Sequence, residues 1–332
     1  MTASDQPKPK KRSRLFVWLA ILVALFAAYS AGWYALANKV RGEVGAAIAA
    51  INAGGANADC ANMSVSGYPL RLVVSCDNLA YENDTTNVAA STGRMDAMAR
   101  IYRPLSPVAD IVGPLRTSAP GMAPLWLDWD KMRAAASLSL TSTAGLALRG
   151  EGVSGQTDPQ DDSEPVQLFS AGKAEVMLQP VGQDVDAGFS FSDLQVDAEA
   201  LDGRVLPPLN GAGAATLKNG LALLGAKAET LRGQSIDIGQ LELSSGTAHI
   251  SVSGPIEVDA DGLIDASLTI RLQDPKAAAA ILGAAIPEQK RQIEQGFSAL
   301  AMFGSEPTMP LKITKGKASL GFIPLGDIKP VQ

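Results

Sequence analysis

The sequence predicts a mainly β protein with minor α structure: an N-terminal transmembrane helix and a stalk helix, then curved antiparallel β-sheets, with a helix pair near residues 275–303. Aromatic residues make up only 5% of the chain, whereas glycine (32) and proline (20) are plentiful, which is typical of short strands joined by turns rather than of a helical bundle. An uncharged run over residues 15–37 predicts the anchor. Strict alternation of apolar and polar residues over 264–272 predicts a half-buried antiparallel strand.

The N-terminus divides into a basic tail, residues 1–14, and the apolar run 15–37. At about 1.5 Å per residue, the run is long enough to cross the roughly 30 Å hydrocarbon core of a bilayer. Because cations on one side of a span hold that side in the cytoplasm, we expect a cytoplasmic tail and a body outside the inner membrane. The cations of the tail are Lys8, Lys10, Lys11, Arg12 and Arg14.

Aromatic residues lie near both ends of the run. Trp18 is near the first end, and Trp33 with Tyr34 near the second, where aromatic rings favour the membrane interface. We therefore interpret these three residues, with Arg12 and Arg14, as the membrane-anchor positions. Residues 35–37, Ala-Leu-Ala, also match a signal-peptidase site, so cleavage after Ala37 is the alternative to an uncleaved anchor.

A stalk helix is predicted over residues 38–53. Apolar residues recur there in steps of three and four, and the sequence Asn-Ala-Gly-Gly at 52–55 predicts its end. The recurring residues are Val40, Val44, Ala47, Ile48 and Ile51.

The chain has two cysteines, Cys60 and Cys76. In an oxidising compartment two cysteines 16 positions apart are expected to form a disulfide. A loop of this size would stabilise the fold by about 3 kcal/mol in the chain-entropy model. A redox-active pair is the alternative, but it requires a C-x-x-C spacing that the sequence lacks.

The rest of the chain is predicted as two β-rich regions, 54–153 and 166–332, separated by a polar loop or boundary at 154–165. Within the second region, the Asp-Ala-Asp-Gly sequence at 259–262 predicts a hairpin turn. The chain ends with two predicted strands joined near Lys315-Gly316.

A helix pair interrupts the second region. Asp274 is a candidate N-cap with Pro275 at the first helical position, and Pro287 is expected to start a second helix. The pair either packs on the sheet or covers an apolar groove.

Two short motifs carry a family resemblance: Gly67-Tyr68-Pro69 with Cys76, and Ile323-Pro324-Leu325-Gly326. With the anchor and stalk, they resemble the DUF2125 family of bacterial envelope proteins over most of the chain after the anchor. The resemblance implies a single-pass protein of the bacterial inner membrane with its C-terminal body in the periplasm, and it carries over no catalytic residue. The strand and Asp-Gly turn rhythm of residues 236–272 is also similar to elongated AsmA-type proteins, which implies lipid handling.

Charge excludes some partners. The chain carries a net charge of −6, and because residues 1–14 carry +4, the remainder carries −10. We therefore expect no nucleic-acid binding and little attraction of the body to anionic head groups, so a membrane role has to come from the span or from apolar surface.

Candidate chemistry is sparse. His249 is the single histidine, and no cluster has zinc spacing. Asp128 and Asp130 are expected to share a strand face with Trp126, which is the best carboxylate pair in the sequence. Because none of these forms a recognisable site, we expect no catalytic residue, no cofactor and no metal.

Three functions fit these features. The first is a membrane-tethered β-rich protein that binds a lipid or another apolar envelope ligand on a continuous apolar sheet face. The second is a non-enzymatic scaffold for another envelope protein, with a filled interior and an exposed edge or patch. The third, an enzyme, would need a cleft around His249 or the two aspartates, and we expect the protein not to be one.

Overall fold

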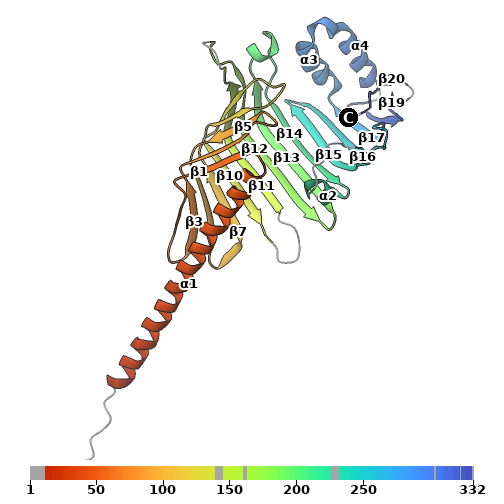
Figure 1. Ribbon diagram of the computed structural model, residues 1–332. Coiled ribbons are helices and arrows are strands. Elements are labelled where there is room, and N and C mark those ends of the chain that lie inside the picture. The colour runs from red at the N-terminus through yellow and green to blue at the C-terminus, as the bar shows by residue number, and fades with distance from the viewer. Residues whose placement is uncertain are drawn as a thin grey trace, which may run out of the picture.

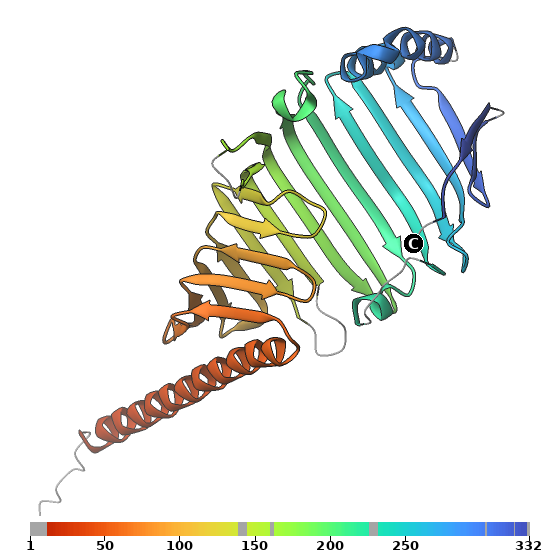
Figure 2. The same cartoon turned by 45° about the horizontal axis from the view of Figure 1, so that its top comes forward.

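The fold is one large antiparallel sheet with a long helix at one end and a helix pair at the other (Figures 1 and 2). The structure is a computed structural model that describes residues 12–138, 145–159, 163–225, 232–302, 304–321 and 323–330. The predicted mainly β class, with a long apolar N-terminal helix and few other helices, is confirmed. Of the predicted basic tail, residues 1–11 lie outside the described residues.

The helices are four α-helices and two short 3₁₀ turns. They are α1 (Arg12–Ala53), η1 (Glu199–Leu201), α2 (Gly220–Gly225), α3 (Pro275–Ala285), η2 (Pro287–Gln289) and α4 (Lys290–Ala301).

The described residues form 20 strands. The first ten are short: β1 (Asn57–Ala61), β2 (Ser64–Ser66), β3 (Arg71–Cys76), β4 (Asn78–Asn83), β5 (Val88–Thr92), β6 (Met95–Arg100), β7 (Arg103–Ile111), β8 (Leu115–Ser118), β9 (Leu125–Asp128) and β10 (Lys131–Ser137). The remainder are β11 (Gly145–Thr157), β12 (Gln167–Val181), β13 (Asp184–Val196), β14 (Leu209–Leu217), β15 (Ser235–Ser245), β16 (Ala248–Val258), β17 (Ile264–Gln273), β18 (Thr308–Thr314), β19 (Lys317–Leu320) and β20 (Ile323–Asp327).

The predicted anchor and stalk are parts of one unbroken helix. The 42 residues of α1 span about 63 Å at 1.5 Å per residue, which is about twice the hydrocarbon core of a bilayer. Among the described residues it is the one helix long and apolar enough to cross a membrane. It ends where Gly55 adopts a φ of +91°, and the Asn52 side chain then accepts a 2.6 Å hydrogen bond from the Ala58 backbone N–H, which fixes the exit into β1.

The sheet divides at β11. Residues 145–151 of β11 pair with β10, whereas residues 154–157 pair with β9. The first arm continues as β10, β7, β6, β3 and β2, and the second as β9, β8, β5, β4 and β1. The chain passes from one arm to the other five times, through one to three residues at 62–63, 77, 93–94, 112–114 and 129–130. Each crossing therefore joins two strands that act as one long strand with a bend.

Backbone irregularities continue this bend into the longer strands. Gly152 of β11 has a φ of +61°, and Asp193 of β13 has a φ of +53°. Register shifts follow at Phe191/Leu194 and at Ile238/Leu241. Bulges of this kind curve a sheet, and the strands of Figure 1 are accordingly arranged as a curved surface rather than a flat one.

Two predictions about boundaries need correction. Residues 154–157 belong to β11 rather than to the polar loop predicted at 154–165, and β11 pairs with β12, so strands of both predicted β-rich regions share one sheet. At the C-terminus, β18 and β19 join at Lys315-Gly316 as predicted, but a third strand, β20, follows them. It escaped prediction because Pro324 and Gly326 interrupt its alternation.

Cys60 and Cys76 form a disulfide with their Cα atoms 5.2 Å apart. Cys60 lies in β1 of the second arm and Cys76 in β3 of the first arm, so the bridge spans the bend. Cys76 is almost fully buried.

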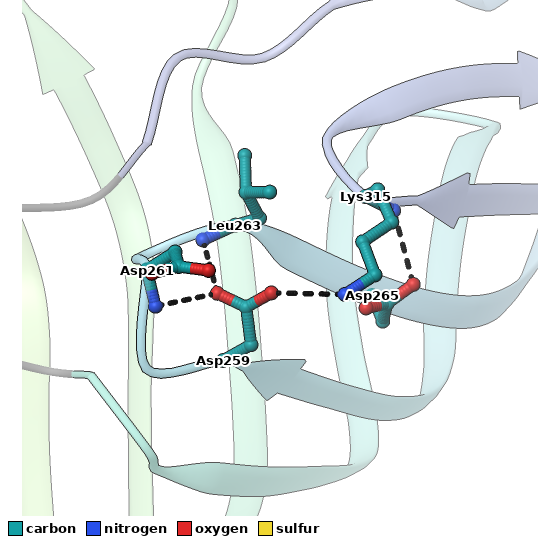
Figure 3. A network of polar contacts seen from close by, with 5 residues as sticks. All are labelled: Asp259, Asp261, Leu263, Asp265 and Lys315. Atoms are coloured by element: carbon teal, nitrogen blue, oxygen red, sulfur yellow. Dashed lines mark hydrogen bonds and ion pairs between the residues drawn. The ribbon is translucent and has the colours of Figure 1, made fainter.

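A polar network ties two turns of the C-terminal region together (Figure 3). Asp259 accepts hydrogen bonds of 2.9 Å from the backbone N–H groups of Asp261 and Leu263, and its second oxygen lies 3.3 Å from Lys315 Nζ. The Lys315 backbone N–H in turn donates to Asp265 at 3.0 Å. The β16–β17 hairpin predicted from residues 259–262 is therefore held against the β18–β19 turn.

The predicted helix pair is present. Asp274 caps α3 by accepting a 3.1 Å hydrogen bond from the Ala277 backbone N–H, with Pro275 in the first helical position. Pro287 starts the 3₁₀ turn η2, and α4 follows it directly.

We predict that replacing both cysteines, Cys60→Ser with Cys76→Ser, lowers the free energy of unfolding by about 3 kcal/mol, because the bridge closes a loop across the bend. Chemical denaturation with and without reductant measures this. Peptide mapping without reductant should recover the two cysteines as one linked pair, and two freely alkylated thiols would contradict the bridge.

A second prediction concerns pH. The hydrogen bond from the Leu263 backbone N–H, supported by Lys315, holds the pKa of Asp259 below its ordinary value of 3.8. The ionised carboxylate therefore stabilises the fold above pH 3.8, and this contribution is lost as the pH falls through the lowered pKa. Asp259→Ala should lower the melting temperature at neutral pH, and the difference from the natural protein should narrow below pH 3.8.

Asp261→Ala is the matched control for this prediction. It removes the same charge, but among the described residues the Asp261 carboxylate makes no hydrogen bond or ion pair; only its backbone N–H takes part. An equal loss of stability in the two variants at neutral pH would show that the Asp259 network is not stabilising.

Candidate functional site

One face of the sheet carries an unbroken line of apolar residues that stand opposite one another across thirteen strands. We call this line the apolar row. It starts in β2 and ends in β18, and successive members are register partners. The row is Val65, Val74, Ala97, Ala109, Ala134, Leu148, Val176, Phe189, Gly213, Leu241, Val252, Ile270 and Met309.

The neighbouring register row lies on the opposite face and is polar at almost every strand. It includes two ion pairs, Arg133 with Asp110 at 2.7 Å and Arg149 with Glu175 at 2.8 Å. We call this line the polar row. It is Ser75, Asp96, Asp110, Arg133, Arg149, Glu175, Ser190, Ala212, Glu242, Ser251, Arg271 and Thr308.

The middle of the apolar face is open to solvent. Four large apolar side chains there are between 40% and 55% exposed. A hollow of about 460 Å³ lies over the first arm and β11–β12, and apolar atoms make up nearly all of its surface. Contiguous exposed apolar surface of this kind marks a binding groove or an interface. The four residues are Leu146, Leu148, Val176 and Phe189.

Two glycines of β14 allow aromatic rings to cover the sheet. Gly213 lies opposite Phe189 and Gly211 opposite Phe191, and a Cβ on either glycine would overlap the facing ring. The rings are parallel, with centroids 6.4 Å apart. The glycine-rich segment at 210–220 therefore serves packing on the apolar face.

The first end of the apolar face is covered by α1. Trp33 and Ala37 are buried against Leu72, beside Val65 of the apolar row, and Trp33 Nε1 donates a 3.1 Å hydrogen bond to the Arg71 carbonyl. Trp33 is 5% exposed, whereas Trp18 on the same helix is 71% exposed. The sequence predicted both tryptophans at the membrane interface, but Trp33 instead fills the contact between helix and sheet.

The other predicted anchor residues all lie on α1. Tyr34 is exposed, and its ring stacks on Tyr68 with centroids 5.9 Å apart. Arg12 and Arg14 lie in the first turn of the helix.

The second end of the apolar face is covered by the helix pair, which Figure 1 shows beside the ends of β16 and β17. A smaller hollow of about 190 Å³ separates the helices from the sheet. Apolar residues line it on both sides: Ala278, Ile281, Leu282 and Phe297 from the helices, and Leu243, Ile250 and Leu272 from the sheet. The pair therefore packs on the sheet and also covers part of an apolar hollow, which were the two alternatives.

The candidate catalytic residues do not assemble. Asp128 ends β9, and the chain bends at Trp129 before β10, so the shared strand face predicted for Asp128 and Asp130 is wrong. Asp128 caps the bend by accepting a 2.8 Å hydrogen bond from the Trp129 backbone N–H. His249 lies on β16 with its Nε2 3.9 Å from Glu242 Oε1.

No group of three or more histidine, cysteine or acidic residues in the described part of the chain could hold a metal ion. The apolar face is thus the most distinctive surface feature of the described residues. Sequence reasoning anticipated such a face in general terms, but the row itself depends on pairing between strands far apart in the chain.

A family model described as "Uncharacterized protein conserved in bacteria (DUF2125)" matches residues 33–329. No curated protein matches the sequence.

We predict that Trp33→Ala releases the helix from the sheet at a cost of about 3–5 kcal/mol, the usual cost of truncating a buried tryptophan. Amide hydrogen exchange in β2 and β3 should accelerate in the full-length protein. Trp18→Ala is the control on the same helix, because Trp18 is exposed. Unchanged exchange in Trp33→Ala, or equal acceleration in both variants, would contradict the docked arrangement.

Proposed function

The chain belongs to the bacterial family DUF2125, and we propose that it is a membrane-anchored periplasmic protein of the inner membrane whose apolar face binds the acyl chains of a membrane lipid. The observation that carries the proposal is the apolar row, which is continuous over thirteen strands and exposed in its middle.

The length of the row suits an acyl chain. Twelve steps between neighbouring strands, at about 4.8 Å each, make a path of about 58 Å. A lipid chain in one leaflet occupies about half of the roughly 30 Å hydrocarbon core, so one chain fits along the part of the row between its covered ends.

The chemistry of the face also suits an acyl chain. The row has no charged or hydroxyl side chain, so nothing along it would recognise a sugar, a peptide backbone or a phosphate. A bound lipid would keep its head group outside the hollow, since an unpaired charge or polar group transferred to an apolar surface is costly.

The position of the face supports a lipid from the anchoring membrane. Val65, at the start of the row, and Leu72 beside it contact Trp33 and Ala37 of α1, which lie within the 15–37 segment predicted to span the bilayer. The apolar face therefore begins beside the anchor helix. A disulfide between Cys60 and Cys76 is consistent with a periplasmic body.

The experiment is native mass spectrometry of the full-length protein extracted in mild detergent, with a search for bound lipid. Val176→Glu places a carboxylate in the apolar row, and a penalty of about 1.4 kcal/mol would already lower lipid occupancy about tenfold. The fold should be retained, because Val176 is 48% exposed.

Met177→Glu is the matched control. Met177 is 47% exposed and is the next residue of the same strand, so its side chain lies on the opposite face. Lipid occupancy should be unchanged in this variant. The pair Phe189→Glu and Ser190→Glu repeats the comparison on β13.

Two outcomes would contradict lipid binding. Equal loss of lipid in both members of a pair would show that the face is not selective. A natural protein that carries no lipid, but retains another envelope protein on the apolar face, would favour the alternative function of a scaffold.

A further inference from the structure

Two neighbouring turns of the first arm project apolar side chains into solvent. The β2–β3 turn carries Tyr68 and Leu70, and the β6–β7 turn carries Tyr102. The turns are adjacent, because the Ile101 backbone N–H donates a 3.1 Å hydrogen bond to the Leu70 carbonyl. Leu70 is 61% exposed and Tyr102 is 67% exposed. We call this pair of turns, residues 67–70 and 101–102, the arm tip.

The arm tip is fixed to α1. The Tyr68 ring lies 5.4 Å from the ring of Trp33 and 6.5 Å from that of Phe26, and its hydroxyl is 2.6 Å from Ser30 Oγ. Tyr29 donates a hydrogen bond to the Pro69 carbonyl.

These contacts set the position of the arm tip along the helix. Ser30 lies seven residues before Ala37, the end of the predicted span, which is about 10 Å along an α-helix. A turn held beside Ser30 therefore lies about 10 Å inside the end of the predicted span, so the arm tip reaches the bilayer through the interface, where tyrosine is favoured.

Three arginines surround the arm tip. Arg71 stands opposite Arg100, and Arg100 stands opposite Arg103 across the β6–β7 turn. All three are exposed, and none forms an ion pair with a carboxylate in the part of the chain that the structure describes. Like charges directly opposite one another on a sheet are destabilising, so a partner of opposite charge would stabilise this arrangement.

We propose that the arm tip is a second membrane contact: Leu70, Tyr102 and Tyr68 enter the interface of the bilayer that holds α1, and Arg71, Arg100 and Arg103 bind the phosphates of anionic lipid head groups. Two observations favour an anionic membrane as the partner. The arm tip contacts the anchor helix, and its three arginines form no ion pair with a carboxylate among the described residues. The guanidinium fork binds phosphate through two hydrogen bonds. The inference depends on the membrane anchoring of the proposed function but not on lipid binding by the apolar face.

The experiment compares amide hydrogen exchange of residues 67–71 and 100–105 in full-length protein, reconstituted in nanodiscs of phosphatidylcholine with and without phosphatidylglycerol. An anionic surface attracts each nearby cation by a factor of about five at 25 °C, so exchange should slow by at least about fivefold when phosphatidylglycerol is present. High salt should reduce the difference. In Arg71→Gln/Arg100→Gln/Arg103→Gln the difference should disappear.

Lys276→Gln/Lys312→Gln/Lys317→Gln is the control triple. It removes the same charge from three exposed lysines in the region of α3, β18 and β19, and it should keep the dependence on phosphatidylglycerol. The proposal is overturned if phosphatidylglycerol does not change amide exchange at the arm tip of the natural protein. It is also overturned if both triple variants lose the dependence on phosphatidylglycerol equally. Val176→Glu should leave exchange at the arm tip unchanged, so failure of lipid binding by the apolar face and failure of the membrane contact are seen separately.

Discussion

The shared register of the strands is the constraint on which the rest of the structure depends. Side chains alternate with a period of two, so a slip of one residue in any strand would turn its apolar side chains to the polar face. β15 shows how the register is kept. Ile236 and Ile238 occupy even-numbered positions of β15, whereas Leu241 and Leu243 occupy odd-numbered ones, so strict alternation would place the two pairs on opposite faces. The bulge between Ile238 and Leu241 brings both pairs to the same face. The apolar row continues through β15 because the bulge lies at the point where the alternation of apolar residues changes phase.

Curvature and end contacts then decide which part of this face is open. The bend between the two arms, bridged by the disulfide from Cys60 to Cys76, lets the first arm and β11–β12 enclose a hollow rather than a flat surface. At its ends the face is covered, by Trp33 of α1 on one side and by the helix pair on the other. An apolar sheet face usually packs against a second layer. In the described part of the chain, helices cover this face only at its ends, and the middle is exposed.

Local features of the chain could be predicted from sequence, and contacts between distant segments could not. Capping by Asp274, the hairpin at 259–262 and the long apolar helix each depend on a few neighbouring residues, and all are present. Trp33 was assigned to the interface because a tryptophan near the end of a span has the same local sequence whether it faces lipid or protein. The strands β6, β7 and β10 contribute mainly alanine to the apolar row, and alanine gives only a weak alternation signal.

The distribution of charge also depends on contacts between distant segments, which the net charge of the sequence does not show. The body carries −10 after residue 14, from which we expected little attraction to anionic head groups. Sequence spreads Arg71, Arg100 and Arg103 over more than thirty positions, but strand pairing places them opposite one another, at the end of the first arm that contacts α1. Attraction over a Debye length of about 8–10 Å depends on the nearest charges rather than on the total. An acidic protein can therefore present a cationic surface to the membrane, provided that its fold gathers the few cations at the point where its anchor leaves the bilayer.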